Sequence, residues 1–338
     1  MYDEIINEIK SNLGENSELN RRYLSSQIEK YKDHPYNEEI IKEISRMMWD
    51  CLSEDEKEEF IRISEEETPI IDILEESFPY IENGEYETAL SILESFINTL
   101  PPMFEDDKVS EYHYFTNPLE EEIFNRYIGA KKEVRYIPNN QPLIDLYYAY
   151  GFLLLETNNL KESEVYLKKA LKINPVSSRI LLELSEIYKI KTPSFNKFFM
   201  YTTEALEYAY YPQDIARCYR NLGHFYIEEN ELETAAGLFN YSMKYELSPL
   251  AYKELQYIKS KGQNIDLTRD ECVSLLKNKN IQVDANPFVI KTLNELANKY
   301  DSEHAFNQAL YFYELLFDLT NDKNILEKIN NIQKIIKY

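Results

Sequence analysis

Apolar residues in the stretch from Pro142 to Pro175 recur at helical spacing in two blocks. The blocks run from Leu143 to Glu156 and from Lys161 to Ile173, and the polar residues 157–159 separate them. A helical period interrupted by a short polar turn predicts a helix, a turn and a second helix. Because two helices of this size cannot bury their apolar faces alone, the pattern also predicts that similar pairs stack against this one.

The same spacing of small and aromatic residues recurs along the chain. Gly151 and Gly223 lie 72 residues apart, about twice the ~34-residue period of tetratricopeptide repeats. The residues that recur at helical spacing in the two copies are Tyr147, Tyr150, Gly151, Leu154, Ser163, Leu167 and Ala170, and then Tyr219, Leu222, Gly223, Tyr226, Ala235 and Phe239. On these residues the chain resembles the tetratricopeptide repeat family.

Further copies fit the same template less completely. A middle copy opens at Leu181, and others open at Ile73 and at Leu293, whereas the segment from Leu250 to Ile281 has two helical patterns but few of the recurring residues. The resemblance implies an all-α fold, an α-α superhelix of about six tetratricopeptide-like units. The composition agrees, because 338 residues contain only seven glycines, and no segment predicts a sheet.

The pattern divides the chain into a cap and an array. Residues 1–69 predict an acidic N-terminal helical cap of four helices, the last opened by a Ser53 and Glu56 capping box. Residues 70–338 predict the repeat array, interrupted by an insertion at residues 102–141. An apolar stripe on residues 324–338 predicts a C-terminal helix that covers the open face of the last unit.

Charge is concentrated in the first part of the chain. Residues 1–130 hold 33 acidic against 11 basic side chains, a net charge of −22, whereas residues 131–338 are nearly neutral. Such a surface repels nucleic acids and anionic membranes, so we expect neither as a partner. The acidic run from Ser53 to Glu67 is interpreted as a solvated helix face, with a docking patch for a basic partner as the alternative.

The chain's start and its cysteines point to the cytoplasm. The N-terminus lacks the basic start and apolar core of a secretory signal, and the longest uncharged apolar run is half of what a membrane span needs. Cys51, Cys218 and Cys272 are too far apart in sequence to form a paired metal-ligand motif, so we expect reduced, partly buried thiols.

The search for catalytic or metal-binding motifs finds little. The chain has no glycine-rich phosphate loop, nucleophile elbow or CxxC pair, and its four histidines are scattered. The insertion contains acidic residues near His113, but their spacing matches neither a calcium loop nor an HExxH pair. We therefore expect no enzyme activity, metal or cofactor. An enzyme or metal protein centred on residues 102–141 remains an alternative.

A binding groove is the more informative prediction. In the family that this chain resembles, the first helix of each unit lines a concave groove, with the groove residues opposite the packing face. Applying this helical phase here predicts the groove residues Asp145, Tyr148, Phe152, Arg179, Arg217, Arg220, Asn221, His224, Lys291, Asn294 and Asn298. The alternative is that these are ordinary solvated groups in salt bridges with Glu183, Glu186 or Glu228.

The sequence thus predicts a non-catalytic protein- or peptide-binding scaffold. Arginine forks suit carboxylates and amides suit a peptide backbone, so the expected occupant of the groove is an acidic or C-terminal peptide segment. A peptide-sensing regulator whose acidic N-terminal part docks a basic partner protein is the main alternative.

Overall fold

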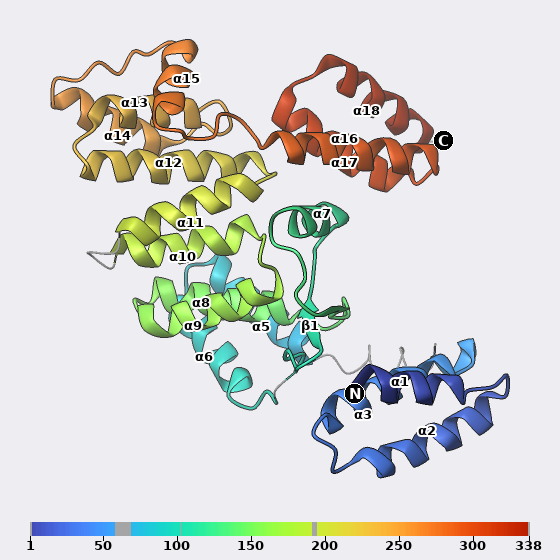
Figure 1. The fold of residues 1–338 in the computed structure, drawn as a ribbon. Helices are drawn as coiled ribbons and strands as arrows, with labels where there is room; N and C mark the ends of the chain where they lie inside the picture. Colours follow the sequence, from blue (N-terminus) through green and yellow to red (C-terminus); the bar gives the residue numbers. More distant parts are fainter. Residues whose placement is uncertain (1, 58–68, 102, 191–194, 337–338) are drawn as a thin grey trace. The chain divides into compact units, whose positions relative to one another are not determined.

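The computed structural model describes residues 2–57, 69–101, 103–190 and 195–336 (Figure 1). Helices account for nearly all of their regular structure, which confirms the predicted all-α class. The chain forms two compact units: unit 1 contains residues 1–114 and 130–146, and unit 2 contains residues 115–129 and 147–338. The predicted division at residue 69 stays a prediction.

Unit 1 begins with the three helices expected from the apolar pattern: α1 (Tyr2–Ser11), α2 (Ser17–Tyr31) and α3 (Asn37–Asp50). Their apolar faces meet in a core formed by Ile6, Ile9, Leu24, Ile40, Ile44, Met47 and Cys51. The Asn16 side chain accepts the Leu19 N–H and caps α2. Alternation of apolar and polar residues at helical spacing therefore predicts these helices correctly.

The predicted capping box after α3 is present. Ser53 N–H donates to the Glu56 carboxylate at 2.8 Å, and Glu56 N–H donates to Ser53 Oγ at 3.2 Å. The predicted fourth helix begins at residues 54–57, which are helical, and the rest of it and most of the acidic run from Ser53 to Glu67 lie outside the described residues. Beyond them, α5 (Pro69–Glu82) and α6 (Tyr86–Ile97) form the first helical hairpin of the repeat kind.

The insertion contains two short strands that the sequence pattern did not predict. Strands β1 (Ser110–His113) and β2 (Glu133–Tyr136) pair in parallel, with Ser110 opposite Glu133. The expectation that no segment forms a sheet is therefore wrong. Parallel strands need a long crossover between them, and here it contains α7 (Pro118–Tyr127), the amphipathic helix predicted in the insertion.

Unit 2 is built mainly from helical hairpins. It contains α7, and α8 crosses into it from unit 1. Its helices from α8 onward are α8 (Leu143–Glu156), α9 (Leu160–Ile173), α10 (Ser178–Ile190), α11 (Phe195–Tyr208), α12 (Pro212–Glu228), α13 (Leu232–Ser242), α14 (Pro249–Ser260), α15 (Arg269–Asn278), α16 (Pro287–Ser302), α17 (Phe306–Thr320) and α18 (Lys323–Ile336). Within the described ranges, no helix has both the length and the apolar character to cross a membrane.

Gly151 and Gly223, the two glycines that recur at the same place in their repeats, lie where paired helices cross closely. A Cβ atom added at Gly151 would meet the Leu167 side chain at 2.8 Å, and one added at Gly223 would meet the Phe239 ring at 2.8 Å. Ser163 Oγ also donates to the Gly151 carbonyl at 2.7 Å. Glycine is needed at these positions for packing, as the sequence pattern predicted.

Four of the hairpins share one turn geometry. The residue that reverses the chain has a left-handed conformation in each: Gly84, Asn158, Asn230 and His304. In each turn the next residue's N–H donates to a carbonyl five residues earlier, for example Asn159 to Leu154 at 2.7 Å. Glycine and asparagine tolerate this conformation best, so these turns mark the repeat at a position that the sequence analysis did not use.

The segment after α13 departs from the hairpin pattern. Both α14 and α15 pack mainly against α13 rather than against each other. The described residues therefore contain five hairpins, α5–α6, α8–α9, α10–α11, α12–α13 and α16–α17, and the estimate of six units is one too high. The segment from Leu250 to Ile281 is also the one that has few of the residues recurring in the other copies.

The last helix, α18, packs against α17, and its role as a cap stays a prediction. Ile325, Ile329 and Ile332 are buried, whereas Leu326, Ile335 and Ile336 are at least 39% exposed. The predicted apolar stripe is thus half right, because a helix resting on one neighbour covers only one side of its circumference. Lys328 Nζ adds a hydrogen bond of 2.7 Å to Asn298 Oδ1.

Candidate functional site

Helices α8, α10 and α12 bring five of the ten predicted groove residues of unit 2 together. The cluster, called the repeat face below, consists of Tyr148, Phe152, Arg179, Glu183, Glu186, Arg217 and Asn221. Each of these three helices is the first helix of its hairpin. The predicted residue Asp145 is exposed and belongs to the part of α8 that lies in unit 1.

Arg217 is the centre of the repeat face. Its guanidinium donates to both carboxylate oxygens of Glu183, at 2.7 and 3.1 Å, and lies 3.7 Å from Glu186. A two-pronged contact of this kind is among the stronger ion pairs in proteins. Arg217 is therefore neutralised within unit 2, as the salt-bridge alternative proposed. A carboxylate from a partner would have to displace Glu183 to reach it.

An aromatic platform lies beside this ion pair. The rings of Tyr148 and Phe152 stack with centroids 6.5 Å apart, and the Arg179 guanidinium lies 4.0 Å from the Tyr148 centroid. Burial and the nearby Glu183 charge raise the pKa of Tyr148 to about 12, so its hydroxyl remains a donor, 3.4 Å from Glu183. Arg179 itself is exposed, so it is the cation of the face most open to a partner.

The three predicted residues of α12 besides Arg217 have contacts with different groups. Asn221 is buried and donates to Ser185 Oγ at 3.1 Å and to Glu186 at 3.2 Å. Arg220 pairs with Glu246 at 2.7 Å, from the segment that follows α13. His224 packs against the Phe195 and Phe198 rings of α11.

The neutral ring of His224 weakens the predicted cationic character further. Burial, followed by the charge of Lys189, lowers the pKa of His224, so its ring is neutral at pH 7. Glu156, on the same helix as Phe152, has its pKa raised by burial and then by Glu183. The face therefore combines one exposed cation, an internal ion pair and partly exposed aromatic rings.

The residues predicted on the last hairpin have other roles. Lys291 is exposed and lies 3.5 Å from Glu295 on the same helix. Asn298 Nδ2 donates to the Asn294 carbonyl at 2.6 Å, and its Oδ1 accepts from Tyr313 Oη and Lys328. These contacts join α16 to α17 and α18. Helical phase predicted their side of the helix but not their structural use.

Comparison with known proteins identifies the hairpin that carries the aromatic platform. A family model described as tetratricopeptide repeat matches residues 144–177, which include α9 and nearly all of α8. Residues 144–177 are a tetratricopeptide repeat. Repeats of this family generally mediate protein–protein interaction. No curated protein matches the chain.

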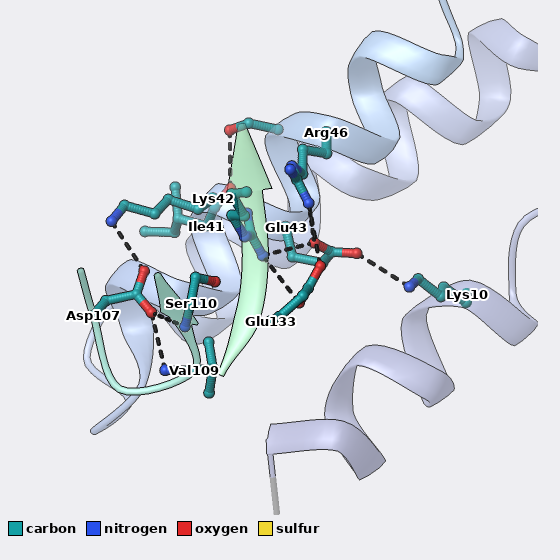
Figure 2. A network of polar contacts seen from close by, with 11 residues as sticks. Lys10, Ile41, Lys42, Glu43, Arg46, Asp107, Val109, Ser110 and Glu133 are labelled. Atoms are coloured by element: carbon teal, nitrogen blue, oxygen red, sulfur yellow. Dashed lines mark hydrogen bonds and ion pairs between the residues drawn. The ribbon is translucent and has the colours of Figure 1, made fainter. Parts of the chain in front are cut away.

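The insertion lies between the α5–α6 hairpin and the tetratricopeptide repeat, and its Asp107 has structural contacts within unit 1. Asp107 accepts the N–H groups of Val109 and Ser110 at 3.0 and 2.8 Å and pairs with Lys42 of α3 at 3.0 Å (Figure 2). Burial alone would raise the pKa of Asp107, but these N–H groups and the Lys42 ammonium outweigh it and lower the pKa. Asp107 is therefore a charged anchor for β1.

A buried ion pair joins β2 to α3 in the same region. Arg135 is 3% exposed and lies 3.1 Å from Glu43, which also contacts Lys10 of α1 at 3.1 Å (Figure 2). In the described part of the chain, no group of three or more histidine, cysteine or acidic residues is arranged to hold a metal ion. The sequence alone could not assign these anchoring roles, because the ion pairs of Lys42 with Asp107 and of Glu43 with Lys10 and Arg135 join residues 33 to 92 positions apart.

Proposed function

We propose that this protein is a non-catalytic scaffold that binds a protein or peptide on the repeat face. One observation carries the proposal: two successive first helices, α8 and α10, place partly exposed aromatic rings and an exposed cation side by side in the region of the tetratricopeptide repeat. Aromatic rings and arginine are the side chains most enriched at the energetic centres of protein interfaces. The three cysteine thiols are buried and unpaired, which supports a cytoplasmic setting.

The proposed occupant is an acidic or C-terminal peptide segment that engages Arg179. Arg217 is already held by Glu183, so Arg179 is the cation that a carboxylate reaches without breaking an internal pair. The stacked Tyr148 and Phe152 rings would pack against an apolar residue next to that carboxylate. Asn221 has both amide hydrogens engaged with Ser185 and Glu186, so it contributes to the shape of the face rather than to capture.

The test is affinity capture from the native lysate with the wild type and two charge variants. Arg179→Glu reverses the exposed cation, and Lys161→Glu makes the same charge change on the exposed surface of α9. Loss of one charge-assisted contact costs about 1.5–3 kcal/mol, equivalent to roughly ten- to hundredfold weaker binding. We expect Arg179→Glu alone to lose the main partner, with both variants melting like the wild type.

Retention of the partner by Arg179→Glu would contradict this proposal. Arg217→Glu is a poorer test, because it would place its new carboxylate against Glu183 and Glu186 and destabilise unit 2. If the captured protein is basic and binds both variants equally, the acidic N-terminal part is the docking surface. The chain would then be a regulator of the kind considered as the alternative.

A further inference from the structure

Helix α7 docks within unit 2 through a buried carboxylate. Glu120 is 4% exposed, and its oxygens accept hydrogen bonds from the Thr116 N–H at 2.7 Å, Asn174 Nδ2 at 2.9 Å and the Tyr210 hydroxyl at 2.9 Å. Asn117, the N-cap of α7, donates to the same Tyr210 hydroxyl at 3.0 Å. The start of α7 is therefore joined to the links that precede α10 and α12.

The other end of α7 is held by aromatic contacts. The Tyr127 ring packs against Tyr208 and Phe288, with centroids 5.7 and 5.8 Å apart, and its hydroxyl accepts from Asn286 Nδ2 at 2.7 Å. Asn286 in turn caps α16 by accepting the Phe288 N–H. Helix α7 thus contacts the three links that precede α10, α12 and α16.

All three donors to Glu120 are neutral. Among the described residues, two tyrosine hydroxyls interact electrostatically with this carboxylate: that of Tyr210, which is one of the three donors, and that of Tyr311. The Tyr211 hydroxyl lies 2.9 Å from that of Tyr311. On α7 itself the single cation is Arg126, which lies over the Phe288 ring. No lysine or arginine among the described residues pairs with Glu120, so burial raises its pKa.

The position of α7 in the chain makes its docking consequential. The chain passes between the two compact units at residues 114 and 115, 129 and 130, and 146 and 147. The first two crossings lead into and out of the segment that contains α7, and both continue into the strands of unit 1. If α7 leaves unit 2, both of these crossings lead into a segment that is no longer docked on that unit.

We propose that α7 is a pH-responsive clasp, docked most firmly on unit 2 when the Glu120 carboxyl is protonated and released more readily as that carboxyl ionises. A released Glu120 ionises in the ordinary glutamate range, whereas a docked one keeps its proton to higher pH. Between these two ranges the docked state binds one more proton, so its population falls as pH rises. The fall is at most tenfold per pH unit and stops above the docked pKa.

Hydrogen exchange followed by mass spectrometry tests this proposal on the full chain. Peptides covering residues 115–129 are compared between pH 4.5 and 8, after correction for the intrinsic exchange rate at each pH. The variants are Glu120→Gln, which cannot ionise, and Glu122→Gln, an exposed residue on the same helix. Peptides from α13 report any general effect of the protein's net charge of −23.

We expect the protection of residues 115–129 in the wild type and Glu122→Gln to fall by up to about tenfold per pH unit relative to α13. In Glu120→Gln it should not depend on pH. A wild-type profile that runs parallel to α13 would overturn the proposal, and this comparison needs no variant to fold. A Glu120→Gln profile as steep as that of the wild type would also overturn it.

Discussion

Replacing Glu43 with glutamine should unfold unit 1 at a much lower denaturant concentration. Arg135 is 3% exposed and would keep only Glu133, at 3.6 Å, as an ionic partner, while its Nε already lacks a hydrogen-bond partner. Removing one member of a buried ion pair typically costs about 3–5 kcal/mol, because the other charge stays buried. The sole tryptophan, Trp49, lies in the same helix as Glu43, so its fluorescence reports the unfolding of unit 1.

Two further variants make this result specific. Glu38→Gln removes an exposed carboxylate from the same helix and should change the unfolding free energy by less than about 0.5 kcal/mol. The double variant Glu43→Met with Arg135→Met removes both charges and should recover most of the loss, since an apolar pair needs no ionic partner. A Glu43→Gln protein as stable as the wild type would show that β2 is not anchored to α3 through this pair.

Deleting residues 324–338 should convert a stable protein into one that associates. The deletion removes three buried isoleucines, each of which contributes about 1.5–3 kcal/mol through burial, and it exposes the apolar surface of α17 that they cover. It also removes the Lys328 hydrogen bond to Asn298. A solenoid end without its cap exposes core residues to water, and such surfaces aggregate.

Size-exclusion chromatography and thermal melting measure this effect, with point variants as controls. Ile329→Ser replaces a buried residue of α18 and should reproduce part of the loss, whereas Ile335→Ser replaces one that is 52% exposed and should behave like the wild type. A truncated chain that remains monomeric and melts at the wild-type temperature would mean that α18 does not act as a cap.

Most helices could be predicted from the sequence because helix formation and pairing depend on short-range patterns. Gly151 and Gly223 show this best, since a small residue at helical spacing requires a bulky neighbour on the partner helix, here Leu167 and Phe239. The strands could not be predicted in this way. Each has only four residues, and the register between Ser110 and Glu133 is set across a helix that docks elsewhere.

The candidate site shows the same limit. Helical phase placed Tyr148, Phe152, Arg179 and Arg217 on one side of their helices, and in unit 2 these residues do meet. The sequence left open whether their charges are paired, with Glu183 named only as an alternative partner, because the Arg217 and Glu183 pair depends on how α12 lies against α10. A shift of one helical turn, about 5.4 Å, would separate these two groups. Sequence patterns therefore predict which residues share a face better than they predict which charges remain exposed.

Photo-crosslinking from the repeat face is the most direct test of the proposed binding role. A photoreactive phenylalanine analogue in place of Phe152 would lie beside the Tyr148 ring and leave Arg179 in place, and the same analogue in place of Val165 would lie on the exposed side of α9. After irradiation with the captured partner, we expect a covalent adduct from position 152 and none from position 165. An adduct from position 165 alone would contradict the account, because the partner would then bind the outer surface and not the face formed by α8, α10 and α12.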